Sequence, residues 1–180
     1  MIKSEYWGKI YILCFIDQIK DNNQFDGLTE LLIDNDFITE EFLPLTDQLD
    51  VKFIEDKVQL KQEILRLDNV HPKTIHFISH GSVNNPGVLC KTNLEYLDVH
   101  RILREFKNKQ NIILNFMNVC MQNDIELSDF KHLFTTNLNS SMAVAIQPTS
   151  ISLYKLYTLS KVESESFHQD INSKNYNMKY

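Results

Sequence analysis

Four segments of the chain are almost continuously apolar and rich in β-branched residues, and amphipathic stretches separate them. The segments are Lys9–Ile16, Thr74–Ser79, Asn111–Val119 and Met142–Ile146. Strands covered by helices on both faces lack a polar side, so this pattern is typical of a parallel α/β sheet. A weaker strand is expected at Phe37–Leu43. We therefore predict an α/β fold whose central sheet is mostly parallel and flanked by helices.

The stretches between these strands carry helical spacing. Asp26–Ile33 and Ile54–Leu67 each place apolar residues on one broad face. Asp98 has the position and side chain of a helix N-cap. Apolar residues then follow at the i, i+3, i+4, i+7 positions, namely Val99, Ile102, Leu103 and Phe106. This third helix would return the chain to the start of the strand at Asn111–Val119.

The length of 180 residues and the hydrophobic content of 43% suit one well-buried core. The sequence contains no internal repeat and no low-complexity linker, so residues 1–160 are predicted to form a single domain. Ser, Asn, Lys and Glu dominate residues 161–180. We expect this polar tail to be partly disordered and dispensable for the core.

Charge and cysteine content narrow the classes of partner. The net charge of −6 gives no basic surface for nucleic acid, which we exclude as a primary partner. Three cysteines without a CxxC pair indicate reduced thiols and predict neither a disulfide framework nor structural zinc. No segment approaches the roughly 20 apolar residues that span a bilayer. The expectation is a cytoplasmic protein without membrane contact.

Two residues with catalytic chemistry follow directly after apolar strands. His80 comes after Thr74–Ser79 and Cys120 after Asn111–Val119, forty positions further on. Functional groups in open α/β sheets gather beyond the carboxyl ends of the strands. A separation of forty residues accommodates the crossover that joins two parallel strands. If the two strands are neighbours, the imidazole and the thiol come within reach of each other.

A Cys–His pair is suited to acyl transfer. The thiolate is the nucleophile, and the imidazole accepts the thiol proton and later protonates the leaving amine. The backbone N–H groups of Gly81 and Cys120 are candidates for an oxyanion hole. A glycine directly after the histidine also lets a substrate carbonyl approach the main chain closely.

The order of these features resembles the caspase-like cysteine peptidases, and most closely their bacterial CHAT branch. The resemblance lies in an apolar strand ending in His80-Gly81, a short strand at Pro86-Gly87-Val88-Leu89, a helix, and a second apolar strand ending in Cys120. It implies a three-layer sandwich, a catalytic dyad of His80 and Cys120, and cleavage of a protein substrate. It also implies partner- or proximity-dependent activation, commonly in bacterial defence or programmed cell death.

Other candidate residues have simpler interpretations. Cys14 is expected to pack in the core, and Cys90 is expected to be a packed thiol. A metal site made of His71, His76, His80 and Cys90 is disfavoured, since His76 lies in mid-strand and the spacing matches no known ligand pattern. Neither a metal nor a cofactor is therefore predicted.

The place of three other histidines and of Asp17 in the predicted elements indicates their surroundings. His100, His132 and His168 fall on predicted helices or in the tail, where solvated or partly packed side chains are expected. Asp17 follows the first strand and lies at the same predicted edge as the dyad. It is a candidate for binding a basic P1 side chain of the substrate, although a solvated surface carboxylate explains it as well.

Two functions follow from these observations. The first is an endopeptidase that hydrolyses a protein or peptide substrate through an acyl-enzyme, with an activating partner or self-association. The second is a catalytically inactive caspase-like α/β module that binds a protein partner. Val119 and Met121 beside Cys120 are unusual for such a nucleophile and motivate this second hypothesis.

Overall fold

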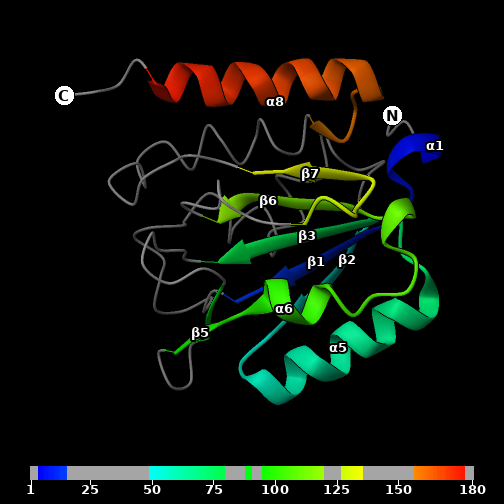
Figure 1. Ribbon diagram of the computed structural model, residues 1–180, viewed down its shortest axis with the longest axis vertical. Helices are drawn as coiled ribbons and strands as arrows, with labels where there is room; N and C mark the ends of the chain where they lie inside the picture. Colours follow the sequence, from blue (N-terminus) through cyan, green and yellow to red (C-terminus); the bar gives the residue numbers. More distant parts are fainter. Residues whose placement is uncertain are drawn as a thin grey trace, which may run out of the picture.

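A five-stranded parallel sheet organises the computed structural model of the chain (Figure 1). The structure describes residues 4–15, 49–79, 88–90, 95–119, 127–135 and 156–176. The strand order is β2 (Leu49–Phe53), β1 (Ile10–Cys14), β3 (Thr74–Ser79), β6 (Ile113–Val119) and β7 (His132–Phe134). Every neighbouring pair is parallel. The predicted α/β class with a parallel sheet flanked by helices is confirmed.

The three central strands are the ones that the apolar pattern predicts. β3 has the predicted bounds, and β1 lies within the predicted Lys9–Ile16. β6 begins two residues later than predicted, because Lys109–Asn111 forms a short 3-10 helix, η1. The segments predicted at Asp26–Ile33, Phe37–Leu43 and Met142–Ile146 lie outside the described residues.

Three of the short strands were not predicted, the first of them β2. In β2, Asp50 and Lys52 alternate with apolar residues, a pattern that suits an edge strand better than a central one. The resemblance predicted the short strand that is present as β4 (Val88–Cys90). Its antiparallel partner β5 (Glu95–Leu97) was not predicted. β7 was not predicted either, and the assignment of His132 to a helix or the tail is wrong.

Local capping explains where helix α5 (Lys57–Val70) begins. The Asp56 side chain accepts hydrogen bonds from the backbone N–H groups of Val58 at 2.8 Å and Gln59 at 2.9 Å. Ile54 was predicted inside the helix, but it is buried in the connection before this cap. The helix ends at His71, whose φ of 51° is left-handed.

The predicted N-cap at Asp98 is confirmed. Its carboxylate accepts a hydrogen bond from the Arg101 N–H at 3.0 Å and starts helix α6 (Val99–Leu103). The helix is shorter than the apolar spacing suggested, although Phe106 beyond its end is still buried. His100 lies on this helix as predicted, but it is buried and not solvated.

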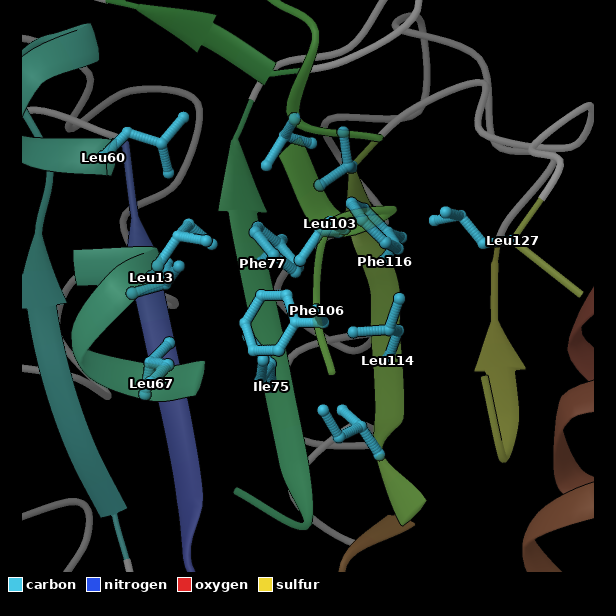
Figure 2. Packing of buried hydrophobic residues seen from close by; sticks show 14 of the residues in the cluster. Leu13, Leu60, Leu67, Ile75, Phe77, Leu103, Phe106, Leu114, Phe116 and Leu127 are labelled. Carbon is cyan, nitrogen blue, oxygen red and sulfur yellow. The ribbon is translucent and has the colours of Figure 1, made fainter. Parts of the chain in front are cut away.

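The main hydrophobic core lies between the sheet and helices α5 and α6 (Figure 2). β3 and β6 contribute Phe77 and Phe116, whose rings stack with centroids 4.5 Å apart. Leu67 from α5 and Leu103 from α6 cover the same face of the sheet. Burial of each such side chain contributes about 1.5–3 kcal/mol to stability, so this layer holds α5 and α6 on the sheet.

A second group of buried side chains covers the opposite face. Trp7, from the short helix α1 (Ser4–Trp7), packs against Phe134 and Tyr157 with ring centroids 5.6 and 5.1 Å away. The Trp7 indole N–H donates a hydrogen bond to the Leu159 carbonyl at 2.9 Å. These contacts tie the two ends of the described chain to the same side of the sheet.

The polar C-terminal segment forms helix α8 (Lys161–Tyr176), which runs beside the edge strand β7 (Figure 1). The expectation of a partly disordered tail therefore differs from the structure over these residues. Ser164 is fully buried, and His168 is hydrogen-bonded to the backbone of Thr135. The contact between α8 and the sheet was hard to predict because polar residues make it and leave no apolar pattern in the sequence. In the described part of the chain, no helix has the length and apolar character to cross a membrane.

Candidate functional site

β3 and β6 are adjacent and end side by side. Ser79, the last residue of β3, is the register partner of Val119, the last residue of β6. His80 and Cys120 are the next residues in the chain, and both lie outside the described residues, as do Gly81 and Asp17. The adjacency of the two strands, on which the dyad hypothesis depends, is confirmed. The relative position of the two side chains stays a prediction.

An irregularity in the pairing brings these two strand ends into register. His76 pairs with Asn115, but the next pair is Ile78 with Asn118, so β6 contains one residue more than β3 between the pairs. Regular pairing from His76 onward would instead place Asn118 opposite Ser79. The bulge also changes which face the residues after it occupy, since successive strand residues alternate between faces. Val119 consequently belongs to the core under α5 and α6.

The ends of β3 and β6 are buried and closely packed. Ser79 is 1% exposed and Val119 is 0% exposed. One layer earlier, Phe77 and Phe116 stack with ring planes only 1° apart, and the His100 ring contacts Phe116 edge-on at 5.3 Å. These aromatic contacts hold the two strands in one relative position directly before His80 and Cys120.

A buried polar network crosses the sheet on its other face. The Tyr157 hydroxyl lies 2.6 Å from His76 Nδ1 and accepts a hydrogen bond from Asn115 Nδ2 at 2.9 Å. All three residues are buried, and His76 and Asn115 are register partners. The predicted burial of His76 is confirmed. Nothing in the sequence singled out Tyr157, because its partners are 81 and 42 positions away.

The network has no group suited to be a nucleophile, and it lies in mid-sheet instead of at the strand ends. Its consequence is structural, since it satisfies polar groups that would otherwise be buried at a cost. It joins β3 to β6 and attaches both to the segment before α8. The network thereby supports the two strands that lead to the candidate dyad.

Of the histidines considered as metal ligands, His71 and His76 have different partners in the structure, and His80 lies outside the described residues. His71 is exposed at the end of α5, with Nδ1 2.7 Å from Asn108 Nδ2, whereas His76 is engaged with Tyr157. Cys14 is the last residue of β1 and Cys90 the last of β4. Among the described residues, no three His, Cys, Asp or Glu side chains gather in a way that could hold a metal ion.

Two histidines join α8 to the edge of the sheet. His168 Nε2 lies 3.1 Å from the Thr135 backbone N and 2.8 Å from its carbonyl oxygen. His132 Nδ1 lies 3.6 Å from a Glu165 carboxylate oxygen. Burial lowers the pKa of both imidazoles, although Glu165 opposes this effect at His132 and the Thr135 hydrogen bond opposes it at His168. The neutral forms are therefore favoured in the folded protein.

Comparison with known proteins found no matching family model, no matching curated protein and no matching solved structure. Any proposal about its function must therefore be argued from the residues and geometry of this chain.

Proposed function

We propose that this chain is a caspase-like cysteine peptidase, with Cys120 as nucleophile and His80 as general base. The observation that supports the proposal is the pairing of Ser79 with Val119 at the ends of adjacent parallel strands. Each candidate residue follows one member of that pair directly. Residues that follow neighbouring parallel strands at the same edge are placed for joint chemistry.

The proposed reaction begins when His80 takes the thiol proton of Cys120. The thiolate attacks a peptide carbonyl, and the N–H groups of Gly81 and Cys120 stabilise the oxyanion that forms. His80 then protonates the leaving amine, and water hydrolyses the acyl-enzyme. The reaction needs Cys120 as a free thiol, which a reducing compartment such as the cytoplasm maintains.

The proposal extends to the fold and the substrate. We assign the parallel sheet and its helices to a three-layer caspase-like sandwich. Asp17 follows β1, whose last residue, Cys14, pairs with Ile78 of β3, so Asp17 is a candidate for recognising a basic P1 residue. The substrate is a protein or peptide, and the family resemblance favours a role in bacterial defence or cell death under the control of a partner or of self-association.

The reactivity of the Cys120 thiol tests the dyad without requiring a complete substrate pocket. The intact protein is treated with iodoacetamide across a pH series, and peptide mass spectrometry follows alkylation at each of its three cysteines. We expect Cys120 to react well below pH 8.5, about the pKa of an ordinary thiol, because an adjacent imidazole lowers its pKa. His80→Gln should return its reactivity profile to the ordinary range.

An electrophilic peptide probe gives the second arm of the experiment. Labelling should disappear in Cys120→Ala and persist in the matched control Cys90→Ala. Labelling that persists in Cys120→Ala contradicts the dyad. An ordinary thiol profile at Cys120 in the folded wild-type protein likewise contradicts it and supports the non-catalytic, partner-binding module.

A further inference from the structure

Helices α5 and α6 lie side by side on one face of the sheet (Figure 1). Residues of both helices line an open groove of about 820 Å³. The two helices point the same way along it. The backbone N–H of Lys107, beyond the end of α6, donates to Asp68 near the end of α5 at 3.0 Å. The groove therefore has one end at the starts of both helices and another end at their C-termini.

Charge is divided between these two ends. Lys57, Lys61 and Arg101 line the end at the helix starts, and Asp68 and Glu105 line the opposite end. Asp98 also lies at the basic end, where its carboxylate caps α6. Within the described part of the chain, the three basic residues and Glu105 form no ion pair. The groove is nearly neutral as a whole but has a basic end and an acidic end.

An exposed apolar ridge runs along α5 beside the groove. Val58 and Leu65 are 63% and 64% exposed, and their separation of seven positions puts them on one face of the helix. Three of the four exposed large hydrophobic side chains among the described residues belong to α5. Apolar side chains concentrated on one helix mark an interaction surface more often than scattered single ones do.

We propose that this surface binds a second copy of the same chain through a two-fold axis. An exposed apolar ridge is self-complementary, because Val58 and Leu65 of one copy can pack against the same side chains of the other. A two-fold axis across the groove reverses the direction of α5, so the basic end of one copy meets the acidic end of the other. The same patch on both copies then forms one isologous interface.

The opposed charges favour a second copy over an unrelated partner. Arg101 lies in α6 and Glu105 follows its end, so the two charges stand at opposite ends of the same wall of the groove. In the antiparallel pair they become neighbours between copies, and the symmetry repeats this contact. Leu65 of each copy contacts the apolar ridge of the other copy.

Sedimentation velocity of the full chain over a concentration series tests the proposal. The wild-type protein should form a dimer. Leu65→Lys should weaken it at least about tenfold, because a charge would replace an apolar side chain at the centre of the interface. Leu65 is already largely exposed, so this variant should fold normally, as circular dichroism can establish.

Charge reversal tests the two-fold arrangement itself. Arg101→Glu and Glu105→Arg should each weaken the dimer several-fold, and the double variant should restore it because opposite charges meet again. Lys52→Glu makes the same change of charge at an exposed residue outside the groove and should leave the dimer unchanged. A wild-type chain that stays monomeric overturns the proposal. A dimer unaffected by Leu65→Lys, or a double variant no tighter than the single ones, also overturns it.

Discussion

Ser79 and Val119 lie opposite each other at the ends of β3 and β6, even though β6 contains one residue more than β3 after the pair His76–Asn115. The bulge that accommodates the extra residue puts Val119 on the face covered by α5 and α6. It also makes both strands stop at the same level. Bulges of this kind recur beside active sites, where they redirect a strand or end its pairing.

Cysteine cross-linking should report this register. Parallel neighbours lie about 4.8 Å apart, within the Cα separation of about 4.4–6.8 Å that a disulfide requires. We expect Ser79→Cys with Val119→Cys to form a disulfide under mild oxidation, with Cys14 and Cys120 replaced by Ala to remove competing thiols. Mass spectrometry of proteolytic peptides identifies the cross-link.

The matched control moves one cysteine by a single position. Ser79→Cys with Asn118→Cys should cross-link poorly, because residue 118 pairs with Ile78 and successive residues alternate between faces. The reverse result, with efficient cross-linking only through position 118, would show that β6 pairs regularly and has no bulge.

Removal of the Tyr157 hydroxyl should destabilise the protein by about 1–3 kcal/mol, because His76 and Asn115 each lose a hydrogen bond in a buried site. Urea denaturation of Tyr157→Phe measures the free energy of unfolding. Tyr11→Phe deletes the same atom from a partly exposed ring and should change it by less than about 0.5 kcal/mol. Equal effects of the two variants would exclude a stabilising role for the network.

Stability should fall as the pH decreases through the range in which histidine titrates. The pKa values of His132 and His168 are lowered in the folded state, chiefly by burial, so the unfolded chain binds more protons below about pH 6.5. The contribution of these histidines is complete above that pH and is lost below it. The slope is at most about 1.4 kcal/mol per pH unit for each proton taken up on unfolding.

His168→Gln isolates this effect, since the amide can still bond to the Thr135 backbone but does not titrate. Denaturation midpoints at pH 7.5 and pH 5.5 should differ less for this variant than for the wild-type protein. His71→Gln changes an exposed histidine and should keep the wild-type dependence. A pH dependence unchanged in His168→Gln would assign the effect to other groups.

Truncation should show how α8 contributes to the fold. Removal of residues 161–180 deletes buried Ser164 and the His168 contact with Thr135, and should destabilise the protein by about 1–3 kcal/mol. Removal of residues 171–180 keeps both contacts and should have a much smaller effect. Thermal denaturation of the two truncated proteins measures this difference. If both truncations were neutral, α8 would be a tail that the core does not need.

The features that could be predicted are those that a short stretch of sequence encodes by itself. The central strands β1, β3 and β6 contain runs of apolar residues, and Asp98 caps its helix through a residue three positions away. The edge strand β7 has only three residues, which is too short for a periodic signal. The candidate dyad was identified because strand ends and reactive residue types are both visible along the chain.

The sequence by itself determined the α/β class, the central strands and the N-cap at Asp98, because each depends on residues that are close together along the chain. Tertiary structure alone decided the strand order, the bulge that aligns Ser79 with Val119, and the network around Tyr157. It also decided how α8 meets the sheet, through His132 and His168. Each of these depends on pairing between distant segments, where one shifted residue moves a side chain to the opposite face of the sheet.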